Sequence, residues 1–173
     1  MPTKNHRHEA RKFISDREDA EIARDMVLSI AVLKVSKLEE YGAIAAALLN
    51  TGSRSLVENE IEQTKLDITE LNRMAENIHL DDSAPVHAHD ATTEMFDHLL
   101  PSAMPITENS TPLDTLLSLL KESDYFISLF DLVCHEYGDD TLVSKNFNKL
   151  HQMETDTKKR IQDTYDAFTL RDY

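Results

Sequence analysis

Hydrophobic and polar positions alternate with the period of an α-helix in four long segments of the chain. In residues 19–49, apolar side chains recur every three or four positions, which places them on one face of a helix. A second apolar set in this segment falls on the opposite side, so we expect the helix to be central and covered on both faces. Residues 53–78, 112–137 and 142–168 each carry one apolar stripe. The pattern predicts an all-α protein.

The boundaries between these segments carry residues that commonly begin and end helices. Gly52 is expected to end the first helix in the left-handed conformation, and Gly138 to end the third. Pro112 suits the first turn of the third helix, where its missing N–H does no harm. The predicted N-caps are Ser53 or Ser55 for the second helix, Ser110 or Thr111 for the third, and Asp139, Asp140 or Thr141 for the fourth.

Residues 79–111 break the helical pattern and form a long connection. An extended chain spans about 3.3 Å per residue and a helix rises about 1.5 Å per residue, so this segment can return along the whole length of a helix of about 25 residues. A short amphipathic helix at residues 92–100 could cover the back of the first helix. We therefore predict a four-helix bundle of two hairpins joined by a long, partly helical crossover. Residues 18–173 form this single domain, and residues 1–17 form a flexible basic arm.

Composition and charge limit the cellular locations and the binding partners that are expected for this chain. The 173 residues carry 32 acidic and 18 basic side chains, a formal net charge of −14. Such a chain is not expected to bind nucleic acid or an anionic membrane directly. Neither an apolar run that could span a bilayer nor a signal peptide is recognisable, and the single cysteine, Cys134, cannot form an internal disulfide. These features favour a cytoplasmic protein.

Five acidic residues are expected to meet near the middle of this bundle. Because the hairpins point in opposite directions, Glu40 and Glu154 lie at the same height, and both fall in the apolar registers of their helices. Carboxylates from four helices can hold a pair of metal ions, for which iron or manganese is the candidate. The predicted ligands are Glu40, Glu60, Asp67, Glu122 and Glu154.

An ion-paired core without metal is the alternative for the same position. Lys34 and Lys37 lie on the core face of the first helix, and an ammonium group there can neutralise a buried carboxylate, so Lys37 could replace the metal. The only Glu-x-x-His pair, Glu76 and His79, lies at the end of the second helix and off its apolar stripe. The sequence leaves both interpretations open.

A second cluster of imidazoles and carboxylates lies in the crossover. Side chains of these types bind zinc, nickel or copper, and two histidines separated by one residue can face the same side of an extended segment. An ordinary polar surface loop has the same composition. The residues concerned are His79, Asp81, Asp82, His87, His89 and Asp90.

Two hairpins joined by a long crossover follow the plan of the ferritin-like superfamily. Residues 40–78 resemble its YciF-like branch, in which a helix containing Tyr-Gly, a short Gly turn and a Glu-rich helix follow in this order. The resemblance implies a ferritin-like bundle and a role in stress responses. Where that branch has a run of Glu followed by Lys and Ala, this chain has residues 64–67, with Asp67 as the nearest acidic counterpart. This chain therefore lacks part of the di-iron motif that the resemblance would otherwise imply.

Three functions are compatible with the sequence. The favoured one is a non-enzymatic ferritin-like bundle that lacks a complete di-iron motif. The alternatives are a di-metal carboxylate protein that oxidises or stores iron, and a helical adaptor that binds a partner protein through its acidic faces. The apolar back of the first helix would support a homodimer if the crossover leaves it open.

Overall fold

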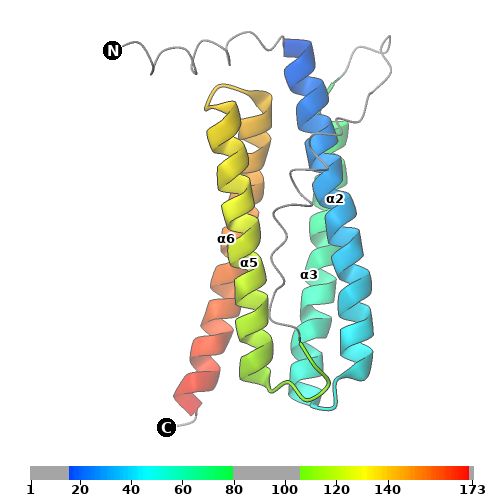
Figure 1. Ribbon diagram of the computed structural model, residues 1–173, viewed down its shortest axis with the longest axis vertical. Coiled ribbons are helices and arrows are strands. Elements are labelled where there is room, and N and C mark those ends of the chain that lie inside the picture. The colour runs from blue at the N-terminus through cyan, green and yellow to red at the C-terminus, as the bar shows by residue number, and fades with distance from the viewer. Residues whose placement is uncertain (1–15, 80–105, 172–173) are drawn as a thin grey trace.

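Four α-helices account for most of the chain that the computed structural model describes, which comprises residues 16–79 and 106–171. They are α2 (Asp16–Ala47), α3 (Thr51–Glu76), α5 (Pro112–Tyr137) and α6 (Leu142–Arg171) (Figure 1). The described ranges contain no β-strand, which confirms the all-α prediction. None of these four helices is long and apolar enough to cross a lipid bilayer.

The helices form two antiparallel hairpins, α2 with α3 and α5 with α6, that pack side by side (Figure 1). The segment before α5 lies against the α2–α3 turn, because the Leu49 amide donates to the Glu108 carbonyl at 3.1 Å. As a result α3 and α5 run parallel, and the chain leaves α3 at one end of the bundle and enters α5 at the other (Figure 1). The four-helix bundle with a crossover connection is therefore present.

Two parts of the domain prediction fall wholly or mostly on residues that the structure does not describe. The predicted short helix at 92–100 lies outside them, as does the arm up to residue 15. Asp16 and Arg17, which were assigned to that arm, belong to the first turn of α2. Asp16, Glu18 and Asp19 favour a helix start at this point, since acidic side chains interact well with the positive end of the helix dipole.

The predicted turn between α2 and α3 is wrong in detail. Asn50, not Ser53 or Ser55, caps α3, and its side-chain oxygen accepts a hydrogen bond from the Ser53 amide at 3.0 Å. Gly52 does not end α2 in the left-handed conformation but lies within the first turn of α3. A Cβ atom at Gly52 would stand 3.1 Å from Asn50 Oδ1 and 3.4 Å from Pro112 Cγ. The glycine is thus suited to close packing of the turn against α5.

The predicted start and end of α5 and the predicted start of α6 are confirmed. Thr111 caps α5 and forms a capping box with Asp114, and Pro112 occupies the first helical position. Gly138 ends α5 with a φ of 76°, a conformation that favours glycine. At the start of α6, the Thr141 hydroxyl accepts a hydrogen bond from the Ser144 amide at 3.1 Å.

The start of α6 has a second capping group that the sequence pattern did not reveal. The Asp19 carboxylate, from the first turn of α2, accepts hydrogen bonds from the Leu142 amide at 2.6 Å and from the Val143 amide at 3.1 Å. These amides have no partner within their own helix. Asp19 therefore ties the beginnings of α2 and α6 together across more than 120 residues of sequence.

Replacing Asp19 with alanine is expected to lower the free energy of unfolding by about 1–2 kcal/mol, because two amides of α6 lose their acceptor. Urea unfolding followed by circular dichroism measures this loss. Asp16→Ala provides the control, since Asp16 is an exposed carboxylate in the same first turn. Equal losses in the two variants would show that Asp19 acts only on the dipole of its own helix.

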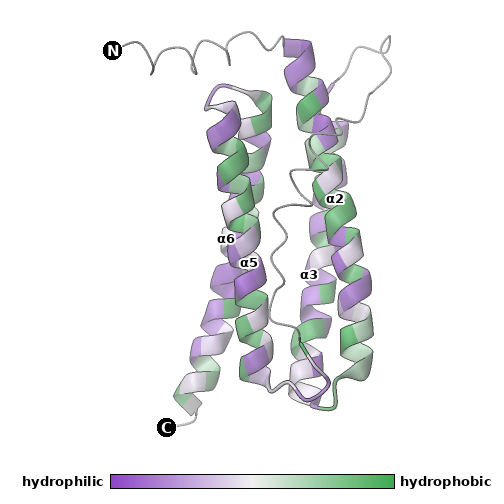
Figure 2. Cartoon of the chain, in the orientation of Figure 1, coloured by the Kyte–Doolittle hydropathy of each residue, from purple (hydrophilic) through white to green (hydrophobic). Residues whose placement is uncertain are grey.

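The bundle core consists of two apolar clusters separated by polar side chains. One cluster lies toward the beginnings of α2 and α6, where the rings of Phe130 and Phe147 meet edge to face at 5.7 Å. The other lies toward the α2–α3 turn and includes Leu48, Val57 and Leu116. Hydrophobic and hydrophilic segments alternate along each helix in Figure 2. The buried polar residues between the clusters are Lys34, Glu60, Thr64, Asp67, Ser123, Glu154 and Thr157.

The outer face of α2 differs from the expectation that this helix is covered on both sides. Val32 and Leu49 are each 71% exposed and Val35 is 42% exposed. The expectation was wrong for these positions, because α3 and α6 pack against α2 from the core side.

Candidate functional site

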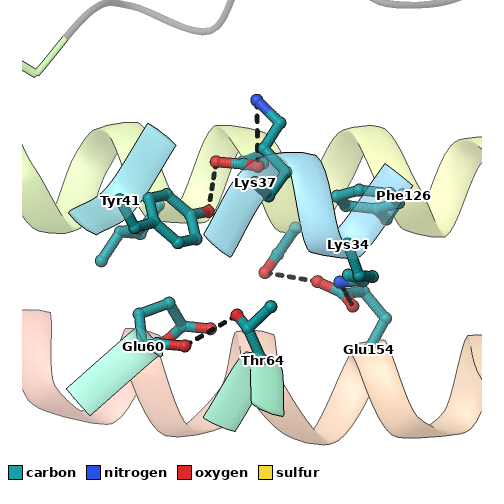
Figure 3. Close-up of a pocket in the computed structure, with 10 residues that line it drawn as sticks. Lys34, Lys37, Tyr41, Glu60, Thr64, Phe126 and Glu154 are labelled. Atoms are coloured by element: carbon teal, nitrogen blue, oxygen red, sulfur yellow. Dashed lines mark hydrogen bonds and ion pairs between the residues drawn. The ribbon is translucent and has the colours of Figure 1, made fainter. Parts of the chain in front are cut away.

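The centre of the polar layer is an ion pair between Lys34 of α2 and Glu154 of α6. Lys34 Nζ lies 3.1 Å from Glu154 Oε2, and both residues are buried. The other carboxylate oxygen, Oε1, accepts a hydrogen bond from the Ser123 hydroxyl at 2.9 Å. The ammonium group also lies 4.0 Å from the centre of the Phe126 ring, which favours a cation (Figure 3). The Glu154 carboxylate is therefore held by two donors from different helices.

The surrounding carboxylates keep Lys34 protonated. Burial by itself lowers the pKa of this amine, but the attraction of Glu154, Asp67 and Glu122 outweighs burial and raises the pKa above its ordinary value. Lys34 is thus a fixed positive charge inside the bundle at neutral pH.

A second group of contacts joins α2 to α5. Lys37 Nζ lies 3.4 Å from Glu122 Oε1, and the Tyr41 hydroxyl donates to Glu122 Oε2 at 2.5 Å. Figure 3 shows the Tyr41 ring directed into the layer. Burial together with the negative charge of Glu122 raises the pKa of Tyr41 well above its ordinary value. Burial by itself lowers the pKa of Lys37, but the attraction of Glu122 and Glu40 outweighs burial, so the pKa lies above its ordinary value.

The remaining carboxylates come from α3. Glu60 accepts a hydrogen bond from Arg160 of α6 at 2.9 Å, yet burial leaves the pKa of Glu60 above its ordinary value. Asp67 accepts a hydrogen bond from Gln63 at 3.0 Å. Burial also raises the pKa of Asp67, and the positive charge of Lys34 opposes that shift. These two acids hold their protons more tightly than an exposed carboxyl does.

Four of the five predicted ligands come together in this layer. Glu60, Glu122 and Glu154 line one small cavity with Lys34, and Asp67 lines a second cavity on the other side of the Lys34–Glu154 pair. Each cavity has a free volume of about 10 Å³, close to the minimum for one water molecule. The prediction of a mid-bundle cluster of carboxylates is thus supported by their positions.

Glu40 is the predicted ligand that lies elsewhere. Its side chain is 55% exposed and pairs with Lys37 at 3.0 Å on the surface of α2. The assignment of Glu40 to the core register was wrong, because Glu40 directly precedes the buried Tyr41 and one residue corresponds to about 100° around the helix axis.

The geometry favours the ion-paired interpretation of this layer. Among residues 16–79 and 106–171, no group of three or more His, Cys, Asp and Glu side chains is arranged to hold a metal ion. Glu154, Glu122 and Glu60 each have a cationic partner, respectively Lys34, Lys37 and Arg160. One oxygen of each of these three carboxylates thus faces an ammonium or guanidinium group, and Asp67 accepts its hydrogen bond from the Gln63 amide.

Two histidines of the described residues, His151 and the predicted candidate His79, lie apart from this layer. His151 pairs with Asp131 at 3.1 Å on the outer side of the α5–α6 hairpin, and His79 is exposed beyond the end of α3. The other crossover candidates, Asp81, Asp82, His87, His89 and Asp90, lie outside the described residues. Cys134 is half-buried, with its thiol 3.4 Å from Asn148 Oδ1, and burial raises the pKa of that thiol. A raised pKa disfavours the thiolate that a nucleophile requires.

Sequence reasoning missed three partners of the carboxylates. Arg160, Ser123 and the hydroxyl of Tyr41 were not assigned to the layer, although each binds one of the predicted acids. The helical period contained part of the signal, because Ser123 lies three residues before Phe126 on the buried face of α5. No comparable signal exists for Arg160, whose side chain is 45% exposed and long enough to reach Glu60.

The raised pKa values in this layer predict sensitivity to alkali. Lys34, Lys37 and Tyr41 bind their protons more tightly in the folded chain than in the unfolded chain. The folded state therefore holds more protons above about pH 10, and the free energy of unfolding falls with rising pH by up to about 1.4 kcal/mol per pH unit for each fully buried group. Lys37 is partly solvated and contributes less.

Urea unfolding measured from about pH 8 to about pH 11 tests this dependence. The fall should be shallower in Tyr41→Phe, which removes one of the three groups. A wild-type profile that stays flat over this range would contradict the raised pKa values.

No family model, curated protein or solved structure matches the chain in comparisons with known proteins.

Proposed function

We propose that this protein is a non-enzymatic, ferritin-like four-helix bundle in which lysine and arginine side chains occupy the place of a di-metal site. The observation that carries the proposal is the buried Lys34 ammonium, 3.1 Å from Glu154 and among the carboxylates that would be metal ligands. The Lys34 ammonium, a cation of the protein itself, neutralises carboxylate oxygens that an iron site would need as ligands. The stress-related role implied by the YciF-like resemblance belongs to this proposal.

The layer supports a structural role, since its charged contacts join one hairpin to the other. Lys34 and Lys37 of α2 pair with acids of α6 and α5, and Glu60 of α3 pairs with Arg160 of α6. Apolar side chains pack in many registers, whereas a buried charge must find its partner. The ion pairs thus favour one alignment of the two hairpins.

Metal loading of the purified, untagged protein tests the proposal. After anaerobic incubation with Fe(II) and desalting, elemental analysis should find well below one iron or manganese ion per chain. Glu60→Gln/Glu122→Gln is the matched variant, because it keeps the side-chain shapes and removes two predicted ligands. About two ions per wild-type chain that are lost in this variant would overturn the proposal. The protein would then be a di-metal carboxylate protein that oxidises or stores iron.

The acidity of the chain supports a second candidate function, an adaptor for a basic protein. A formal net charge of −14 attracts cationic surfaces over long distances and repels nucleic acid. Capture of a lysine-rich peptide by the immobilised protein should weaken strongly with added salt, because salt screens exposed charges. Capture that is independent of salt, or absent at low salt, would contradict the adaptor.

A further inference from the structure

An apolar stripe runs along the side of α2 that no other described helix covers. Leu28, Val32 and Val35 follow one another along it at helical spacing. Val32 is 71% and Val35 is 42% exposed, whereas Leu28 is half-buried at the edge of the core. Apolar residues are distributed more evenly around α2 than around the other three helices. The helix lies at the edge of the bundle, and green hydrophobic segments recur along it in Figure 2. A stripe of this kind on a surface helix is typical of a contact site.

Opposite charges flank the stripe at equal distances. Arg24 lies one helical turn before Leu28, and Glu39 lies one turn after Val35. Within the part of the chain that the structure describes, neither side chain has an ion-pair partner. The arrangement from Arg24 to Glu39 is therefore self-complementary. When two copies of this segment lie antiparallel, the positive end of each faces the negative end of the other, and the apolar side chains face one another.

We propose that two copies of this chain pack through the α2 stripe, with their α2 helices antiparallel about a two-fold axis beside Val32. Val32 then contacts Val32 of the second copy, and Leu28 contacts Val35 of the second copy. Arg24 of each copy meets Glu39 of the other, which gives two symmetric ion pairs. Such an isologous contact closes on itself and stops at the dimer. Apolar residues three and four apart are the spacing that antiparallel helix pairs bury.

The charges also select this alignment over the other one that the stripe allows. An axis near Glu39 would bring Gly42, Ala46 and Leu49 into the contact and bury the exposed Leu49 side chain. It would also place the two Glu39 carboxylates against each other at the centre, where like charges are unfavourable. The axis beside Val32 avoids that repulsion. This inference is independent of the proposed function, because no residue of the polar layer takes part.

Sedimentation equilibrium of the full chain tests the dimer. The wild type should have about twice the 19.7 kDa mass of one chain at micromolar concentration, and Val32→Glu should have the mass of one chain. Arg24→Glu, which sets two glutamates against each other at both ends, should raise the dissociation constant at least about tenfold. The charge-swapped double variant Arg24→Glu/Glu39→Arg should return it to within about threefold of the wild type.

Leu66→Glu is the matched control, because Leu66 is 64% exposed on α3 and lies off the stripe. It should leave the dissociation constant unchanged, and circular dichroism should show that every variant keeps its helices. A monomeric wild type, or a dimer that Val32→Glu does not disrupt, would overturn the proposal. Failure of the charge swap to restore the dimer would overturn the antiparallel alignment.

Discussion

Replacing Lys34 with methionine is expected to lower the free energy of unfolding by about 3–5 kcal/mol. Methionine fills a similar volume, but it leaves the buried Glu154 carboxylate with only the Ser123 hydroxyl as a donor. An uncompensated charge in the core is far more costly than the loss of a surface ion pair. Urea unfolding at neutral pH measures the loss.

Lys65→Met is the control for this variant. Lys65 is an exposed lysine on α3 that pairs with Glu62 at 3.0 Å, so its removal should change the free energy of unfolding by no more than about 0.5 kcal/mol. Losses of similar size in the two variants would mean that Lys34 does not neutralise a buried acid.

Phe130→Ala is expected to cost about 3–5 kcal/mol for a different reason. The Phe130 ring is buried and packs against both Phe126 and Phe147, which joins α5 to α6 within the larger apolar cluster. Alanine leaves a cavity that rigid neighbouring helices fill only in part. Leu66→Ala, at an exposed apolar position, should be nearly neutral in the same unfolding experiment. Phe130→Ala with a loss below about 1 kcal/mol would contradict the packing of this cluster.

The sequence was sufficient to predict the helices and the pairing of hairpins because these depend on local signals. Apolar residues at helical spacing, the Thr111-Pro112 start and Gly138 each act within a few residues, and the structure agrees with all of them. Asn50 shows where local signals fail. The predicted N-caps were Ser53 and Ser55, whereas Asn50 is the observed cap, and the close packing of Gly52 against Pro112 favours this earlier start of α3.

The polar layer was predictable in position but not in its pairings. Glu154 is buried on the core face that periodicity assigns to it, and Glu60 and Asp67, which flank the predicted apolar stripe of α3, are buried as well. Which cation meets which carboxylate depends on the distance between helices and on side-chain length, as with Arg160 and Glu60. Asp19 shows the same limit, because its partners are amides of a helix that begins more than 120 residues later. Contacts of this kind depend on the tertiary structure and produce no periodic pattern in the sequence.

The measurement that tests the ion-paired core most directly is a double-mutant cycle on Lys34 and Glu154. Lys34→Met and Glu154→Leu should each be strongly destabilising, since each leaves one buried charge without its partner. The double variant should recover roughly 2–3 kcal/mol relative to the sum of the single variants, because it removes both charges together. Losses that simply add, within about 0.5 kcal/mol, would contradict the account and show that the two residues do not neutralise each other.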